Sequence, residues 1–392
     1  MNSFKFYSAV LLIALVPFLL LAQNSEKPFS VEPVFDLDQP KTAGLTFADN
    51  IQTFTIFAPD SSQNTYNHGV VLYPFKGKLF AMWQSSARDE DAADTQVYYS
   101  VSQDLRSWSD PITLTRKSES GITTSGGWWS HNDTLIAFIN VWPENEDTPR
   151  QGYTAFMRST DGQNWSALKR VKVNNGTPIK GIIEQDLRAL PDGRIITSFH
   201  MQPGLIATPY YTDDLSATTG WIAGEMTNLP SDKFISRELE PSWFYREDGA
   251  VVMIFRDQHS SHKKLASISY DRGESWSTPE LIDTPDSRSK QSAGNLPDGT
   301  AFMVNNPSAD KTRYPLAITL SEHGYTFDRA LLIRSGGEDL QPLRYSGKYK
   351  REGYSYPKSI VWGDYLYVGY ATNKEDVEGS RIPLSALKYS TQ

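Results

Sequence analysis

Short runs of alternating apolar and polar residues, each followed by a turn sequence, recur along this chain of 392 residues. In one of them, Leu265, Ser267 and Ser269 lead into the turn Asp271-Arg272-Gly273, and Trp276 opens the next run. An Asp in such a turn accepts hydrogen bonds from backbone N–H groups, and Gly tolerates a left-handed backbone. The pattern predicts a β-hairpin.

This turn recurs at an interval that indicates a repeat architecture. Ser159–Ser166 is nearly the same sequence, Ser102–Ser109 lacks only the Gly, and the segments near 213 and 323 are worn copies. The turn positions 104, 161, 213, 271 and 323 are separated by 57, 52, 58 and 52 residues. A period of this size that contains several strands is typical of propeller blades.

A second, tighter turn joins the first two strands of each repeat unit and allows the units to be aligned. These turns are Lys76-Gly77, Asn132-Asp133, Pro191-Asp192-Gly193, Glu247-Asp248-Gly249, Pro297-Asp298-Gly299 and Gly363-Asp364. The last unit has only three strands, and Thr53–Phe57 would supply its fourth and close the ring. We therefore predict an all-β propeller of six four-stranded blades. Residues 28–50 or 334–355 could supply a seventh.

The first residues of the chain predict export. Lys5 precedes an apolar run from Ala9 to Leu21 that ends at Ala22 and is short for a membrane span. We expect a signal peptide at 1–22, a lead-in segment at 23–50 and one catalytic propeller domain at 51–392; an uncleaved anchor is the alternative. The chain has no cysteine, which excludes disulfides and a lipidated Cys. The mature protein is expected in the periplasm or outside the cell, away from the membrane.

Composition narrows the choice of partners. The formal net charge is −8 and there is no long basic run, which disfavours nucleic acid but leaves room for a local basic pocket. The chain is rich in aromatic residues, with 10 Trp, 20 Tyr and 18 Phe, as is common in all-β proteins and in proteins that bind carbohydrate. We expect a monomer without cofactor or metal.

Candidate chemistry gathers where the inner strands of all blades begin, because these strands surround one central funnel. Counting back from the tight turns places His68, Glu184, Glu240 and Lys290 at this level, with Gln291 beside Lys290. The last unit adds residues 354–358, and the ends of second strands add residues 84–88, His200 and Arg256. Trp128 is either a platform for a sugar ring or a residue packed between blades.

Three segments of the chain resemble successive blades of the sialidase (neuraminidase-like, Asp-box) superfamily. They are "WFYREDGAVVMIFRD", "QSAGNLPDGTAFMVNNPSADKTRYPLAITLSEHGYTF" and "GYSYPKSIVWGDYLYVGYA". The resemblance covers roughly residues 65–388, counted by the propeller repeat. It implies a six-bladed propeller whose members clamp a substrate carboxylate with three arginines, use a Tyr–Glu pair as nucleophile and an Asp on a loop as acid and base.

Carried onto this sequence, the resemblance makes Arg256 the second arginine and Arg313 the third. Tyr354 or Tyr356 falls in the region of the nucleophile, and Glu240, or alternatively Glu238, near the glutamate. The first arginine would fall in residues 66–69, where this chain has His68. The loop aspartate has three candidates, Asp89, Asp91 and Asp94. This departure favours a branch of the superfamily that is not a true sialidase.

The exchange of an arginine for histidine suggests β-elimination on a uronic acid. That reaction needs the carboxylate neutralised, which an Arg or the amide of Gln291 can do, and a base and an acid, which His or Tyr can supply. In residue types and fold the chain is similar to the propeller ulvan and rhamnosyl-glucuronate lyases. The catalytic candidates are His68, Tyr356, Tyr354 and Glu240. The substrate-binding candidates are Arg256, Arg313, Gln291, Arg88, His200, Lys358 and Trp128.

The leading hypothesis is thus a secreted lyase or dehydratase that acts on an acidic, uronic-acid-containing oligosaccharide or polysaccharide. Two alternatives stay open. One is an exo-glycosidase of the sialidase type for an acidic or rhamnose-capped glycan. The other is a propeller that binds glycan without catalysis, because fold does not fix function.

Overall fold

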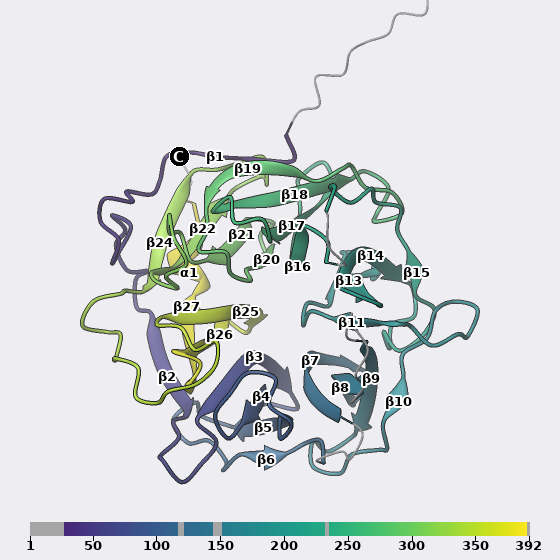
Figure 1. The fold of residues 1–392 in the computed structure, drawn as a ribbon. Coiled ribbons are helices and arrows are strands. Elements are labelled where there is room, and N and C mark those ends of the chain that lie inside the picture. The colour runs from purple at the N-terminus through teal and green to yellow at the C-terminus, as the bar shows by residue number, and fades with distance from the viewer. Residues whose placement is uncertain (1–26, 117–120, 144–150, 232–234, 390–392) are drawn as a thin grey trace, which may run out of the picture.

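Six antiparallel sheets surround one central axis in the computed structural model, which describes residues 27–116, 121–143, 151–231 and 235–389 (Figure 1). The innermost strand of every sheet faces the axis, and the later strands follow outward. This is the predicted six-bladed propeller. The predicted signal peptide at 1–22 lies outside the described residues.

The first three blades follow each other along the chain. Blade 1 consists of β3 (Tyr66–Phe75), β4 (Lys78–Ser86), β5 (Gln96–Ser102) and β6 (Ile112–Thr113). Blade 2 consists of β7 (Gly121–His131), β8 (Thr134–Pro143), β9 (Tyr153–Ser159) and β10 (Lys169–Arg170). In blade 3 the inner strand is divided into β11 (Gly181–Ile183) and β12 (Arg188–Ala189), which both pair with β13 (Ile195–Met201); β14 (Ile206–Thr212) and β15 (Ile222–Ala223) follow.

The other three blades complete the ring. Blade 4 consists of β16 (Glu238–Tyr245), β17 (Val251–Asp257), β18 (Lys263–Ser269) and β19 (Glu280–Pro285). Blade 5 consists of β20 (Ser292–Asn295), β21 (Ala301–Asn305), β22 (Leu316–Ser321) and β24 (Arg329–Arg334). Blade 6 consists of β25 (Tyr354–Trp362), β26 (Tyr365–Thr372), β27 (Asp376–Pro383) and β2 (Gln52–Phe57).

The strand β2 closes the ring, as the sequence predicts. It pairs antiparallel with β27, with Thr53 opposite Ser380 and Phe54 opposite Gly379. Residues from near the two ends of the propeller thus share one sheet, in which β2 covers the outer edge of β27 (Figure 1). An exposed strand edge can pair with another chain, so this closure protects the last blade.

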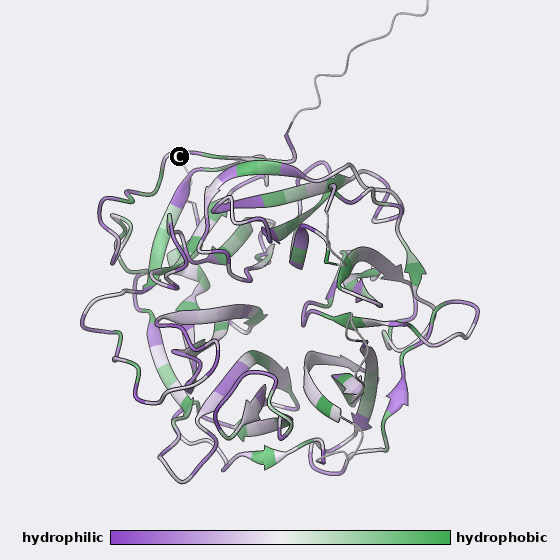
Figure 2. Cartoon of the chain, viewed as in Figure 1, coloured by the Kyte–Doolittle hydropathy of each residue, from purple (hydrophilic) through white to green (hydrophobic). Residues whose placement is uncertain are grey.

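Apolar side chains fill the spaces between neighbouring blades. Hydrophilic residues follow most of the connecting loops (Figure 2). Between blades 1 and 2, Phe80, Tyr99 and Trp165 surround Trp128, with ring centres 5.8 to 6.3 Å from that of Trp128. Trp128 also donates a hydrogen bond from its indole nitrogen to the carbonyl of Val71. It therefore holds two blades together, and its expected alternative role as a sugar platform is not met.

The Asp-type turns lie at the outer side of the blades and hold their backbone as predicted. Asp271 Oδ1 accepts hydrogen bonds from the backbone N–H groups of Glu274 and Ser275 at 3.1 and 2.8 Å. Asp161 does the same for the residues two and three positions further along, both at 2.8 Å. Gly273 has φ of 91°, a conformation that a side chain would resist.

The segment before the propeller packs against blade 5 rather than leading in freely. Its short strand β1 (Ser30–Val31) pairs in parallel with β23 (Thr326–Phe327), and Phe29 is buried against Phe244 and Phe327. One helical turn, α1 (Leu384–Leu387), ends the described part of the chain. Across the described residues no helix has the length and apolar character needed to cross a membrane.

Candidate functional site

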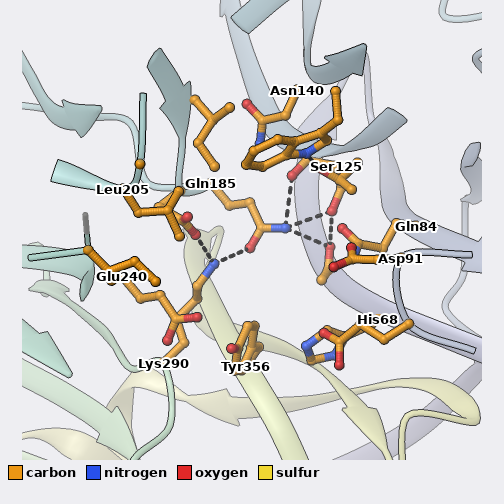
Figure 3. A pocket seen from close by; sticks show the side chains of 18 residues that line it. His68, Gln84, Asp91, Ser125, Asn140, Gln185, Leu205, Glu240, Lys290 and Tyr356 are labelled. Carbon is orange, nitrogen blue, oxygen red and sulfur yellow. Dashed lines mark hydrogen bonds and ion pairs between the residues drawn. The ribbon is translucent and has the colours of Figure 1, made fainter. Parts of the chain in front are cut away.

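A cavity of about 370 Å³ opens at the level where the inner strands begin, and all six blades contribute to its wall (Figure 3). The residues that carry chemistry there are His68, Gln84, Glu90, Asp91, Asn140, Glu184, Gln185, Glu240, Lys290 and Tyr356. Four apolar side chains, Trp142, Ile182, Leu205 and Ile235, form another part of the wall. The convergence of residues far apart in sequence is the one that the propeller repeat predicts.

Irregular backbone in the inner strands turns these side chains toward the cavity. The pairing register shifts between His68 and Val71 in β3, between Leu239 and Ser242 in β16, and between Ser355 and Lys358 in β25. Inside these bulges Gly69, Glu240 and Tyr356 have φ of 67°, 55° and 57°. Left-handed backbone is unfavourable for Glu and Tyr, and such conformations concentrate at functional sites.

Tyr356 and Glu240 meet at Arg256, which ends β17. Nη1 of Arg256 lies 2.8 Å from Glu240 Oε2 and 3.0 Å from the Tyr356 hydroxyl, to which it donates a hydrogen bond. The phenol and the carboxylate therefore share one guanidinium nitrogen. The guanidinium of Arg313 lies 5.0 Å from the centre of the Tyr356 ring, and the Lys290 ammonium lies 4.8 Å from it.

Burial and charge set the protonation of this pair. Burial, together with the negative charge of Glu240, raises the pKa of Tyr356 well above its usual value, although Arg256 and Arg313 oppose the shift. Burial acts to raise the pKa of Glu240, but the charges of Arg256 and Lys290 outweigh it and the pKa is lowered. At neutral pH Tyr356 therefore carries its proton and Glu240 is ionised.

His68 packs against Tyr356, with ring centres 4.2 Å apart. It is 2% exposed, and neither of its ring nitrogens has a hydrogen-bond partner among the described residues. Burial and the positive charges of Lys374, Arg313 and Lys290 hold the pKa of His68 well below its usual value. The imidazole is therefore neutral and has a nitrogen free to accept a proton.

A buried ion-pair network supports Glu240 from the side of blade 3. Glu184 Oε2 lies 2.5 Å from Lys290 Nζ, and its other oxygen lies 3.1 Å from His200 Nδ1. The second ring nitrogen of His200 accepts a hydrogen bond from the backbone N–H of Glu240. Gln185 joins blades 1, 2 and 5, since its amide donates to the carbonyls of Gly69 and Ser125 and accepts from Lys290. The network fixes the bulge that carries Glu240.

The loop that follows β4 brings two carboxylates over the cavity. Glu90 and Asp91 line the wall, and Glu90 is held by Lys374 at 2.6 Å. Asp89 and Asp94 instead accept backbone N–H groups, from Lys348 at 2.7 Å and Ala87 at 2.8 Å. Of the three aspartates considered from the sequence, Asp91 is the one that lines the cavity.

Several predicted residues lie beside the cavity and hold it in shape, so their expected contact with substrate needs correction. The side-chain amide of Gln291 donates hydrogen bonds to the carbonyls of Glu240 and Ile254 and accepts one from Lys264. His200 is occupied as described above. Lys358 is buried against Asp186 and the Gln291 carbonyl, at 2.9 and 3.2 Å. Each of these polar groups already has its partners in the protein.

Three predicted residues lie elsewhere. Tyr354 is fully buried and donates its hydroxyl to the Ser335 carbonyl at 2.8 Å, because the bulge after it separates its direction from that of Tyr356. Arg88 is largely exposed beside Asp89, and Trp128 packs between blades. The expected site roles of Tyr354, Arg88 and Trp128 are therefore corrected, whereas His68, Glu240, Arg256, Arg313 and Tyr356 do come together.

The sequence analysis did not single out Glu90, Asn140, Gln185, Trp142 or Lys374. Trp142 lies at the end of β8 and Lys374 shortly after β26, the second strands of blades 2 and 6. The rule that singled out Arg256 would have found both had it been applied to every blade. Gln185 directly follows Glu184 at the predicted level. In the described ranges no three His, Asp or Glu side chains converge in a way that could hold a metal ion.

Comparison with known proteins agrees with this architecture. Residues 77–368 match the family model of the BNR repeat-like domain. No curated protein matches the sequence.

Solved structures match this chain at low sequence identity, so the comparison establishes similarity of fold alone. A sialidase is 19% identical with a TM-score of 0.58, over 91% of this chain but only 35% of its own length. A protein of unknown function from Dyadobacter fermentans is 14% identical with a TM-score of 0.64, over 85% of this chain and 99% of its own. The intramolecular trans-sialidase from Ruminococcus gnavus is 12% identical with a TM-score of 0.61, over 86% and 99%. The chain belongs to the BNR repeat-like domain family and shares the six-bladed propeller fold of the sialidase structures.

Proposed function

We propose that this protein is a glycan-processing enzyme that cleaves the bond to a terminal acidic sugar, with Tyr356 as nucleophile. A sialidase-like propeller suggests glycan processing in general. The observation that carries the finer proposal is the position of the Tyr356 hydroxyl at the wall of the cavity, where it accepts a hydrogen bond from the same Arg256 nitrogen that is paired with Glu240. A nucleophile paired with a base, which is in turn oriented by a third group, is the arrangement that covalent catalysis requires.

Each group has a defined task in the first step. The Tyr356 oxygen attacks the anomeric carbon while its phenolic proton passes to Glu240, and the bond to the leaving oxygen breaks. Arg256 stays within hydrogen-bond distance of the phenolic oxygen and stabilises the negative charge that develops on it. Because Tyr356 is neutral before reaction, it can approach a sugar that carries a carboxylate without charge repulsion.

The leaving oxygen needs a proton, and Asp91 is placed to give it. Asp91 lines the cavity from the loop after β4, on the wall that also carries His68 and Tyr356. In the second step Asp91 takes a proton from the water that attacks the glycosyl–tyrosine bond, and Glu240 returns its proton to Tyr356. Arg313 and Arg256 would bind the substrate carboxylate, since a guanidinium matches two oxygens at once.

A second candidate reaction, β-elimination on a uronic acid, is favoured by one observation. His68 is neutral, has no hydrogen-bond partner and lines the same cavity. Such an imidazole could remove the C5 proton while an arginine stabilises the resulting charge at the carboxylate. Tyr356 would then protonate the leaving oxygen instead of forming a covalent bond.

Incubation with a panel of acidic oligosaccharides, analysed by mass spectrometry, tests both reactions. Our proposal expects products that together contain one added water, and loss of this activity in Tyr356→Phe. An unsaturated fragment, with near-ultraviolet absorbance and loss of activity in His68→Ala, would select elimination instead. Intact oligosaccharides across a panel that includes uronic and nonulosonic acids would contradict both.

A further inference from the structure

His68 is a buried imidazole at the cavity wall to which hydrolysis through Tyr356 gives no task (Figure 3). Its side chain lies beside Tyr356, and both ring nitrogens lack a hydrogen-bond partner among the described residues. The Nε atoms of two arginines around Tyr356, Arg256 and Arg313, are also buried without a described partner. An unpaired buried polar group is costly, so these atoms are most easily explained if a bound ligand pairs with them.

The backbone is fixed on both sides of His68. The N–H of Asn67 donates to the Lys374 carbonyl at 2.9 Å. On the other side the Gly69 carbonyl accepts a hydrogen bond from Ser125 Oγ at 2.7 Å. A Cβ on Gly69 would lie 2.6 Å from the same Ser125 oxygen, so the bulge packs tightly against blade 2. The backbone that carries the imidazole is therefore held in place at the cavity wall.

The side chains packed around His68 are aromatic and cationic. The centre of its ring lies 4.2 Å from that of Tyr356 and 6.1 Å from that of Tyr66. The Lys374 ammonium lies 6.0 and 5.8 Å from the centres of the same two rings. Two further cations lie against the Tyr356 ring, Lys290 at 4.8 Å and Arg313 at 5.0 Å from its centre.

Of these three cations, Arg313 is the one without a counter-charge among the described residues. Lys374 is paired with Glu90 at 2.6 Å, and Lys290 with Glu184 at 2.5 Å. The guanidinium of Arg313 donates a hydrogen bond to a neutral hydroxyl, that of Ser355, at 2.7 Å. A carboxylate that binds at Tyr356 would supply the missing negative charge.

Such a carboxylate would also change the protonation of His68. Burial, followed by the positive charges of Lys374, Arg313 and Lys290, holds the pKa of the free imidazole well below its usual value. A negative charge beside the imidazole favours its protonated form, and a carboxylate oxygen can accept a hydrogen bond from the imidazolium N–H. Binding of an acidic sugar and protonation of His68 therefore favour each other.

The other titratable groups around His68 keep their charge when the ligand binds. Burial raises the pKa of Tyr66 and of Tyr356 well above the usual value, so both phenols are neutral at neutral and acid pH. The carboxylates of Glu90 and Asp91 line the same cavity and are present with and without a ligand. The charge that changes beside His68 is thus the one that the ligand brings.

We propose that His68 holds the carboxylate of the sugar together with Arg256 and Arg313, and that it takes up one proton from solvent when this acidic sugar binds. The inference rests on the proposed function, in which the terminal sugar carries the carboxylate. It also bears on the reaction, because an imidazolium cannot remove the C5 proton of a uronic acid. Affinity for the acid should fall as the pH rises, until His68 is neutral in the complex as well.

Isothermal titration calorimetry of the wild-type protein tests the proton uptake directly. The probes are glucuronate and N-acetylneuraminate, free sugars that have no glycosidic bond to cleave, and their uncharged methyl esters. Titrations at about pH 6 avoid uptake by Lys374, whose pKa is about 8, and are repeated in two buffers with different enthalpies of ionisation. We expect an acid to bind with uptake of at least about half a proton, and its ester to bind more weakly without uptake.

Two variants identify the group that takes up the proton. His68→Gln should abolish the uptake and weaken binding of the acid about tenfold at this pH. His200→Gln is the matched control, because His200 is equally buried but does not line the cavity, and it should keep the uptake. Equal heats in both buffers with wild-type protein, or an uptake that survives in His68→Gln, would overturn the proposal.

A second measurement does not depend on the folding of a variant. In wild-type protein labelled with nitrogen-15 histidine, the acid should convert one of the six histidines from the neutral to the imidazolium pattern, and the ester should convert none. Binding of the acid without such a change would contradict the uptake, and no binding of either acid would overturn the carboxylate site as a whole. The proposed function is read separately, from the products of oligosaccharides that can be cleaved.

Discussion

Glu240 and Tyr356 occupy equivalent bulges in the inner strands of blades 4 and 6, and each is followed by a proline. Their φ angles are 55° and 57°. Residues other than Gly cost about 1–2 kcal/mol in this conformation. The left-handed backbone at these two positions lowers the stability of the fold, and it directs one carboxylate and one phenol to the same arginine.

The first prediction concerns Tyr356. Tyr356→Phe should lower kcat by at least about a thousandfold, because removal of a covalent nucleophile leaves only binding and electrostatic effects. The matched control is Tyr354→Phe, which loses a hydrogen bond to Ser335 in the core of its blade. That variant should lose about 1 kcal/mol of stability and keep its kcat. Equal loss of activity in both variants would contradict the assignment.

The second prediction concerns the acids of the loop after β4. Asp91→Asn should slow cleavage of a substrate with a basic leaving group by about a hundredfold or more. A nitrophenyl glycoside needs little protonation on departure, so its kcat/KM, which reports the first step, should fall much less. Asp89→Asn is the control, because Asp89 accepts a backbone N–H from Lys348 and does not line the cavity. A leaving-group dependence that follows Asp89 would refute the role of Asp91.

The third prediction is a pH dependence set by Lys374. Burial, followed by the charge of Arg313, lowers the pKa of Lys374 to about 8, although Glu90 opposes the shift. As the pH rises through this value Lys374 loses its proton and Glu90 its ion pair, so kcat/KM should fall. Lys374→Arg keeps the charge and should move the alkaline limb to higher pH.

Deprotonation of Lys374 does not unfold the protein, so loss of folded protein through this group cannot explain the fall of kcat/KM at alkaline pH. Between pH 8 and the usual lysine value, unfolded Lys374 binds a proton that folded Lys374 does not. Its contribution to stability therefore rises with pH in this window. Lys358, whose pKa burial also lowers to about 8, is the comparison. An alkaline limb that moves in Lys358→Arg but not in Lys374→Arg would contradict the prediction.

The fold was largely predictable because its signals are local and repeated. Asp271 and Asp161 mark turns that recur, and Thr53–Phe57 was the strand that the last blade lacked. The site was less predictable, because the direction of a side chain in an inner strand depends on the bulge. Tyr354 and Tyr356 would lie on one face of a regular strand, yet the first is in the core and the second at the cavity.

Residues that support others were hardest to assign from sequence. Gln291 and His200 lie at the level predicted for the site, but their polar groups are occupied by the backbone of Glu240. Arg313 and the strand of Tyr356 are held together by Asn306, which donates to the carbonyls of Arg313 and Tyr354, contacts that no spacing in the sequence reveals. The residue types indicated chemistry, and the packing decided which of them reach the cavity.

The fourth prediction separates architecture from chemistry. Asp271→Ala removes an oxygen that accepts two backbone N–H groups of the turn and should lower the free energy of unfolding by roughly 1–2 kcal/mol. Because this turn lies at the outer side of blade 4, kcat should stay within about twofold. Chemical denaturation and steady-state kinetics on the same preparation measure both. A large loss of kcat in a folded variant would show that the outer turns influence the site.

The most direct test of the account is to trap the intermediate on Tyr356. A fluorinated glycosyl fluoride of the acidic sugar that proves to be cleaved should form the glycosyl–enzyme bond faster than water breaks it. Digestion and tandem mass spectrometry should then find the added sugar on the peptide with Tyr356, and Glu240→Gln should slow its formation. An adduct on another residue, or turnover with no adduct on Tyr356, would contradict the central claim.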